Sequence, residues 1–129
     1  MARIILVDDD PISSTLASDL LYDGGHAIGW VNDGAKALAL MRARPPHLAI
    51  LDCAMPGLSG VDLLRAMRVE PRLLAVPVLM LTSRLSERDE RIAYEAGADD
   101  YLRKPVDPDQ LLGRVDALLL RNSKIRAIG

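Results

Sequence analysis

Short apolar runs alternate along the chain with longer segments in which apolar residues recur every three or four positions. The runs are rich in Ile, Leu and Val, as expected of strands that helices cover on both faces of a sheet. Five runs predict strands, at residues 4–7, 26–31, 48–51, 78–81 and 101–103. A segment of helical periodicity follows each run, so the pattern also predicts five helices.

Side chains that suit the N-cap position mark the expected helix starts. They are Asp10, Asp33, Ser59, Ser86 and Asp107. In the first helix, Ile12, Leu16 and Leu20 recur at a spacing of four and predict its apolar face.

Strands that alternate with helices form parallel βαβ units with right-handed crossovers. The predicted fold class is therefore α/β: an open, doubly wound, five-stranded parallel sheet, flavodoxin-like, with strand order 2-1-3-4-5 and five helices. A closed eight-stranded barrel is excluded because it needs far more chain than 129 residues. Residues 1–121 are expected to form one domain, and residues 122–129 a short C-terminal tail or the start of a linker.

The composition fits one ordinary globular domain. Half of the residues are hydrophobic, and the single cysteine, Cys53, excludes a disulfide within the chain. The net charge of −2 argues against direct nucleic-acid binding. No apolar run approaches the roughly 20 residues of a membrane span and no signal peptide is recognised, so a cytoplasmic protein without a membrane partner is expected.

Chemically capable side chains follow four of the five predicted strands: Asp8 and Asp9, Asp52, Thr82 and Lys104. Because ligands of open α/β sheets bind beyond the carboxyl ends of the strands, these side chains are expected to converge. Carboxylates about 4 Å apart repel by roughly 4 kcal/mol at an effective dielectric near 20, so the cluster needs cations. Lys104 supplies one, and a partly hydrated Mg²⁺ suits the rest. This set of groups is what phosphoryl transfer to an aspartate requires.

Four stretches of the chain share their order and spacing with a known family. They are Leu6–Pro11 (LVDDDP), Leu51–Gly57 (LDCAMPG), Leu81–Ser83 (LTS) and Gly97–Pro105 (GADDYLRKP). On these stretches the chain resembles the receiver domain of two-component response regulators, from about Ala2 to Arg121.

The resemblance implies a phosphoacceptor domain that uses Mg²⁺. Asp52 would receive the phosphoryl group from a sensor histidine kinase or a histidine phosphotransfer protein. Asp9, Asp52 and the main-chain carbonyl of Ala54 would bind Mg²⁺ directly, and Asp8 would act largely through water. The domain would be no enzyme toward other substrates, because it catalyses only the phosphorylation and dephosphorylation of its own aspartate.

The resemblance also implies how the signal is held and passed on. Thr82 and Lys104 would hold the phosphoryl oxygens, and Tyr101 would be an aromatic switch that follows Thr82. Ala54 and Arg84 would modulate the lifetime of the phosphorylated state. The shifted equilibrium would be sensed by an output domain or a downstream protein, or by a homodimer through the fourth helix, fifth strand and fifth helix. Gln110 weakens the case for that dimer, because the transcription-factor subgroup usually has an acidic residue there.

Two other functions stay open from the residues alone. Asp8 and Asp10 also fit the Asp-x-Asp pattern of haloacid-dehalogenase-like phosphohydrolases, in which Asp8 would be the nucleophile, but that function leaves Asp52 unexplained. A degenerate receiver that is never phosphorylated would act as a protein-binding module.

The remaining chemistry-bearing residues are expected to be structural. Cys53 should be a buried small hydrophobe, because it alternates to the strand face opposite Asp52. His26 and His47 begin strands, away from the crevice. Trp30 is expected in the core or at the rim of the second strand, far from Asp52, and so to report phosphorylation poorly by fluorescence. Tyr101 has a second interpretation, as a half-buried packing residue.

Overall fold

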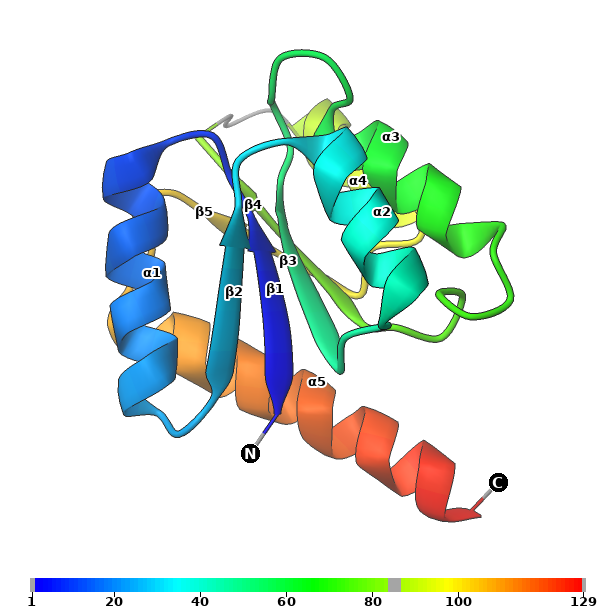
Figure 1. Cartoon of the computed structure of the whole chain (residues 1–129). Helices are drawn as coiled ribbons and strands as arrows, with labels where there is room; N and C mark the ends of the chain where they lie inside the picture. Colours follow the sequence, from blue (N-terminus) through cyan, green and yellow to red (C-terminus); the bar gives the residue numbers. More distant parts are fainter. Residues whose placement is uncertain (1, 84–86, 129) are drawn as a thin grey trace.

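The computed structural model describes residues 2–83 and 87–128, in which strands and helices alternate along the chain (Figure 1). The strands are β1 (Arg3–Val7), β2 (Ala27–Val31), β3 (Leu48–Asp52), β4 (Val78–Thr82) and β5 (Asp100–Arg103). The helices are α1 (Pro11–Asp23), α2 (Gly34–Ala43), α3 (Gly60–Arg68), α4 (Glu87–Ala96) and α5 (Pro108–Ile128).

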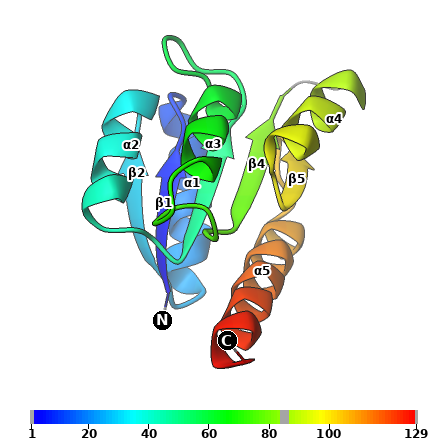
Figure 2. The ribbon, with the colours of Figure 1, turned by 90° about the vertical axis from the view of Figure 1, so that its right-hand side faces the viewer.

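The five strands form one parallel sheet in the order β2-β1-β3-β4-β5 (Figure 2). The register brings the carboxyl ends of the strands to one edge, with Val7 beside Leu51 and Thr82 beside Arg103. The predicted fold class and strand order are confirmed. This edge is where the predicted functional side chains leave the strands.

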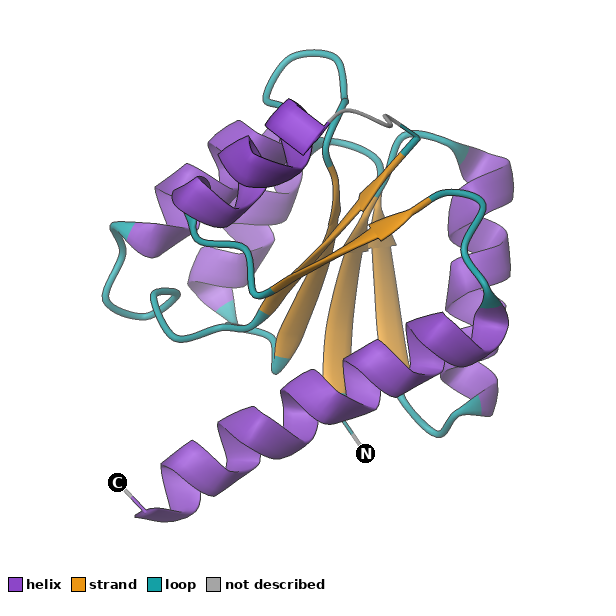
Figure 3. Ribbon diagram, turned by 180° about the vertical axis from the view of Figure 1, so that it is seen from behind, coloured by secondary structure: helices purple, strands orange, loops and turns teal. Residues whose placement is uncertain are grey.

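Helices cover both faces of the sheet, α1 and α5 on one side and α2, α3 and α4 on the other (Figures 1 and 3). Strand side chains alternate between the two layers. In β1, Ile4 and Leu6 belong to the cluster under α1 and α5, whereas Ile5 and Val7 belong to the cluster under the other three helices. Burial on both faces explains why β1, β3 and β4 are continuous apolar runs, whereas the edge strand β2 is buried only at Val31.

Helix α1 buries a face different from the expected one. Ile12 and Leu16 are 74% and 61% exposed, so the prediction that they mark the buried face was wrong. The buried side chains of α1 are instead Ser14, Ala17 and Leu21. Two of these three are small, and Ala17 and Leu21 belong to the apolar cluster between α1, α5 and the sheet. The Ser14 hydroxyl is satisfied inside the helix, because it donates to the main-chain oxygen of Asp10.

The expected N-caps are observed where the structure describes them. Asp10, Asp33 and Ser59 each accept a main-chain N–H from the first turn of their helix. Asp107 accepts two such groups, from Asp109 and Gln110, at the start of α5. Ser86, expected to cap the fourth helix, lies outside the described residues.

Helix α5 continues to Ile128, so the chain is helical where a short tail was expected from residue 122. Leu111, Val115 and Leu118 of this helix are buried against the sheet. The last turns of α5 extend past the sheet (Figure 3). The domain boundary at residue 121 stays a prediction. Within the described part of the chain, no helix combines the length and apolarity needed to cross a membrane.

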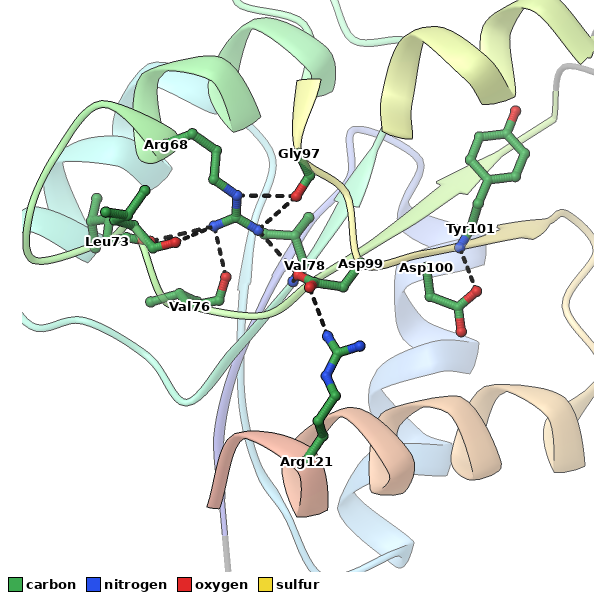
Figure 4. A network of polar contacts seen from close by, with 10 residues as sticks. Arg68, Leu73, Val76, Val78, Gly97, Asp99, Asp100, Tyr101 and Arg121 are labelled. Atoms are coloured by element: carbon green, nitrogen blue, oxygen red, sulfur yellow. Dashed lines mark hydrogen bonds and ion pairs between the residues drawn. The ribbon is translucent and has the colours of Figure 1, made fainter. Parts of the chain in front are cut away.

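An arginine at the end of α3 ties together the loops at the opposite edge of the sheet, beyond the amino ends of β4 and β5 (Figure 4). The Arg68 guanidinium donates to the main-chain oxygens of Gly97 and Val76, at 2.9 and 2.8 Å, and to the Asp99 carboxylate at 3.1 Å. Asp99 also accepts the main-chain N–H of Val78 and a hydrogen bond from Arg121 of α5. We call Arg68, Asp99 and Arg121 the arginine network.

Candidate functional site

The sheet brings five predicted site residues together at the carboxyl edge. Asp8 and Asp9 follow β1, Asp52 and Thr82 are the last residues of β3 and β4, and Lys104 follows β5. Each strand ends at this edge because all strands are parallel and in register. The convergence expected from the sequence is therefore observed for the carboxylates and the lysine.

Three carboxylates form the centre of the site. Asp8, Asp9 and Asp52 each offer an oxygen, and these oxygens lie within 4.8 Å of one another. Asp8 and Asp52 are buried, at 1% and 7% exposure, whereas Asp9 is exposed. We call these three residues the acidic cluster.

Lys104 neutralises part of the charge of the acidic cluster. Its Nζ lies 2.7 Å from Oδ2 of Asp8 and 3.7 Å from Oδ2 of Asp52. One ammonium against three carboxylates leaves the cluster short of positive charge. An oxygen-only donor set with this excess of negative charge fits a hard divalent cation such as Mg²⁺, which binds through one or two carboxylates and keeps several waters.

The Asp52 carboxyl is the titratable group most altered by this environment. Burial raises the pKa of Asp52 from its ordinary value of 3.8 to about 6, and the negative charge of Asp8 acts in the same direction. The Lys104 ammonium and the main-chain N–H of Ala54, 3.4 Å from Oδ1 of Asp52, oppose the shift. Asp52 is thus a buried carboxylate whose negative charge is costly without a further cation.

Asp8 is held through every one of its polar atoms. Its main-chain N–H donates to the Val31 carbonyl at 3.1 Å, and Oδ1 accepts the main-chain N–H of Asp10 at 2.9 Å. Oδ2 accepts from Lys104, and the main-chain oxygen accepts the indole N–H of Trp30 at 2.8 Å. Asp8 is therefore fixed in place before any ligand binds.

Trp30 contacts the site at Asp8, a contact that the expectation of distance from Asp52 did not include. Trp30 pairs with Leu6 in the register of β1 and β2, and its long side chain reaches along the strand as far as Asp8. The side chain is 45% exposed, which agrees with the rim and not the core, the two positions that were expected. The adjacency of β1 and β2 in the predicted order was the available signal, since it puts the end of β2 beside the aspartates.

Thr82 and Tyr101 lie on the same face of the sheet and are both buried, at 1% and 7% exposure. Burial raises the pKa of the Tyr101 hydroxyl, and the nearby Thr82 side chain opposes this shift. Among the described residues, the buried Tyr101 hydroxyl has no hydrogen-bond partner. The Tyr101 ring stands beside α4 (Figure 4). Its centroid lies 6.4 Å from that of Tyr94 in this helix. Thr82 and Tyr101 thus connect the carboxyl edge of the sheet to helix α4.

The other residues singled out in the sequence lie outside this centre. Ala54 is exposed beside Asp52, and Arg84 lies outside the described residues. Cys53 is partly buried against the core under α2, α3 and α4. His26 lies 3.2 Å from Asp116, and Nδ1 of His47 accepts the main-chain N–H of Arg3, so both histidines lie away from the acidic cluster.

Gly60, which was not predicted to be functional, shapes the loop after Asp52. A Cβ atom at Gly60 would lie 1.9 Å from the main-chain oxygen of Asp52, far inside contact distance. Gly60 also donates its main-chain N–H to the Cys53 carbonyl at 3.2 Å. The start of α3 is thereby packed directly against the backbone of Asp52. The only signal in the sequence is a glycine directly after the Ser59 cap.

Comparison with known proteins agrees with this geometry. Residues 4–116 match the response regulator receiver domain family. The chain is 38% identical over 120 residues to the DNA-binding response regulator MtrA of Mycolicibacterium smegmatis. The matched segment covers 93% of this chain and 51% of MtrA. It therefore spans about half the length of that relative.

Two further relatives are matched over nearly their whole length. Protein PilH of Pseudomonas aeruginosa is 35% identical, with 92% of this chain and 98% of PilH covered. The structure of chemotaxis protein CheY4 of Vibrio cholerae superposes with a TM-score of 0.86 at 30% identity, covering 92% of this chain and 98% of CheY4. These matches favour the receiver over the phosphohydrolase that Asp8 and Asp10 left open.

Proposed function

The chain belongs to the response regulator receiver domain family, whose members are the phosphoacceptors of two-component systems, and from this premise we propose that Asp52 is its phosphoacceptor. The observation that carries the proposal is the buried Asp52 carboxylate, which faces Lys104 and the other two aspartates at the carboxyl edge of the sheet. Receiver domains interact with histidine kinases and with output domains, and both are proposed as partners.

In the proposed reaction an Asp52 carboxylate oxygen attacks the phosphorus of a phosphohistidine. The O–P bond forms as the P–N bond breaks, and the histidine nitrogen leaves with the bonding electron pair. Lys104 and Thr82 are proposed to bind the transferring phosphoryl oxygens. The preference for an ionised Asp52 near neutral pH supports its role as nucleophile, since its pKa of about 6 still leaves the carboxylate the main form.

Asp9, Asp52 and the Ala54 carbonyl are proposed to hold Mg²⁺ directly, and Asp8 to act through water. Bound Mg²⁺ would neutralise the charge of the phosphoryl oxygens. The indirect role of Asp8 is supported by its two carboxylate oxygens, which already accept hydrogen bonds from Asp10 and Lys104. Asp9, exposed at the mouth of the cluster, has its carboxylate turned toward the other two.

Phosphorylation is proposed to draw Thr82 toward the phosphoryl group and Tyr101 after it. The burial of both side chains on one face, next to α4, supports this coupling. Ala54 and Arg84 are proposed to set the lifetime of the phosphorylated state. The domain would catalyse its own phosphorylation and dephosphorylation only.

The surfaces for partners are proposed on two sides of the site. Ile12 and Leu16, exposed on α1 directly after the aspartates, provide apolar area for the phosphodonor protein. A homodimer through α4, β5 and α5 stays a prediction. On that face, Asp100 and Arg114 form an ion pair within the chain, at 2.6 Å. The cytoplasmic location expected from the sequence also stays a prediction.

The test is the intact mass of the protein after incubation with acetyl phosphate and Mg²⁺. We expect a gain of one phosphoryl group in the wild type, and none in Asp52→Asn or without Mg²⁺. A gain that survives in Asp52→Asn but is lost in Asp8→Asn would favour the phosphohydrolase instead. No gain in the wild type, even from a histidine-phosphorylated donor protein, would favour the unphosphorylated binding module.

A further inference from the structure

Trp30 donates its indole N–H to the main-chain oxygen of Asp8, at an Nε1···O distance of 2.8 Å. This oxygen belongs to the peptide group that joins Asp8 to Asp9. Because a peptide group is planar, a hydrogen bond that restrains its oxygen also restrains the position of the Asp9 Cα atom. Trp30 therefore acts on the backbone that presents Asp9 to the acidic cluster.

The hydrogen bond lies just beyond the last pair of the ladder between β1 and β2. Val7 pairs with Val31 at the end of this ladder, and the Val31 carbonyl accepts the main-chain N–H of Asp8. The chain after β2 turns toward α2, which begins at Gly34 behind the Asp33 cap. The indole thus supplies a donor at a position where β2 itself no longer runs beside β1.

Asp9 depends on this backbone anchor more than its neighbours do. Asp8 and Asp52 are buried, and Asp8 is also held through both carboxylate oxygens. Asp9 is exposed, so packing does little to hold its position. Its placement follows largely from the orientation of the peptide group before it.

We infer that Trp30 is a positioning residue of the proposed metal site, because its indole N–H holds the Asp8–Asp9 peptide in the orientation that presents Asp9. The inference rests on the proposed function, in which Asp9 binds Mg²⁺ directly. Trp30 is the only tryptophan of the 129 residues, so its fluorescence reports on this one position. Its emission is expected to respond when a cation enters the acidic cluster.

The experiment measures Mg²⁺ binding to the full chain by calorimetry and by tryptophan emission. Trp30→Phe keeps an aromatic ring but removes the N–H donor, and we expect it to weaken Mg²⁺ binding by about three- to ten-fold, the effect of one hydrogen bond. Leu40→Ala is the matched control, since Leu40 is half exposed and lines the same surface pocket as Trp30. Its Mg²⁺ affinity should equal that of the wild type.

The wild-type emission should change during the Mg²⁺ titration with the calorimetric midpoint, and this change should be absent in Asp9→Asn. Urea unfolding without Mg²⁺ checks that Trp30→Phe is folded. If Trp30 had only a structural role, the variant would be less stable but would bind Mg²⁺ as tightly as the wild type. Unchanged affinity in folded Trp30→Phe overturns the inference. If that variant does not fold, an unresponsive wild-type emission at calorimetric saturation overturns it. A wild type that binds no Mg²⁺ overturns the proposed metal site and, with it, this inference.

Discussion

The two edges of the sheet use the same kinds of charged groups in opposite ways. At one edge, Asp99 is surrounded by donors: the guanidinium groups of Arg68 and Arg121 and the main-chain N–H of Val78. At the other edge, the three carboxylates of the acidic cluster share the ammonium of Lys104. At the first edge the one carboxylate is held by two cations, whereas at the other edge three carboxylates share one cation.

The difference separates a structural role from a functional one. A partly buried ion pair with its hydrogen bonds satisfied joins segments of the fold and has no remaining capacity for a ligand. A buried carboxylate without enough cations has a raised pKa, and a cation that binds beside it stabilises its charged form. The arginine network should therefore govern the stability of the chain, and the acidic cluster its response to pH and to ligands.

Arg68→Ala should break the paired edge and have the largest effect. The Arg68 side chain is 17% exposed, and its loss takes the guanidinium away from the Gly97 and Val76 carbonyls. Asp99 also loses this donor and keeps Arg121 and the main-chain N–H of Val78. We expect the free energy of unfolding to fall by about 3 kcal/mol, as for other broken buried pairs. Urea unfolding measures the loss.

Arg65→Ala is the matched control for this prediction. Arg65 lies one turn earlier on α3, with an exposed side chain that pairs with Asp62. Its loss should change the free energy of unfolding by less than about 0.5 kcal/mol. Equal effects of the two variants would contradict the structural role of the arginine network.

Asp52→Asn should stabilise the metal-free protein by about 1–2 kcal/mol at pH 7.5. The folded pKa of Asp52, about 6, is above the ordinary value of 3.8, so between these values the folded chain binds more protons than the unfolded chain. Wild-type stability attributable to Asp52 is therefore lost as pH rises from about 4 to about 6. The asparagine carries no charge and avoids this loss.

Thermal unfolding at several pH values without divalent cations measures this effect. The difference between the Asp52→Asn variant and the wild type should be small at pH 4 and reach its full size above pH 6. Asp19→Asn, at an exposed position of α1, is the control and should show no such pH dependence. A stability difference that is the same at pH 4 and pH 7.5 would mean that the charge of Asp52 is not its cause.

Arg121→Ala should have the smallest effect and divides the arginine network into its parts. The Arg121 side chain is 54% exposed, although its hydrogen bond to Asp99 is 2.7 Å long. We expect a loss of about 0.5 kcal/mol that shrinks at high salt, as for exposed ion pairs. Urea unfolding at low and high ionic strength tests this. A loss as large as that of Arg68→Ala would show that the outer pair, and not the buried guanidinium, holds this edge together.

The alternation of apolar runs and helical segments was enough to determine the fold class and the edge of the sheet at which the site lies. The strand order 2-1-3-4-5 was chosen as a common order of doubly wound sheets and is confirmed. Residues that follow parallel strands meet at one edge of the sheet, so Asp8, Asp9, Asp52 and Lys104 could be assigned to one cluster before any coordinates. The N-caps at Asp10, Asp33 and Ser59 were equally local, since each depends on a side chain and the helical turn next to it.

Tertiary structure alone decided the features that depend on how elements pack. Spacing could not choose between two faces of α1, because Ile12 and Leu16 lie exposed while smaller side chains face the sheet. Trp30 and Asp8 are 22 positions apart in the sequence, and the indole reaches Asp8 because β1 and β2 pair. Arg68 likewise finds its partners 29 and 31 positions later. Side-chain reach across neighbouring elements depends on distances that no local pattern contains.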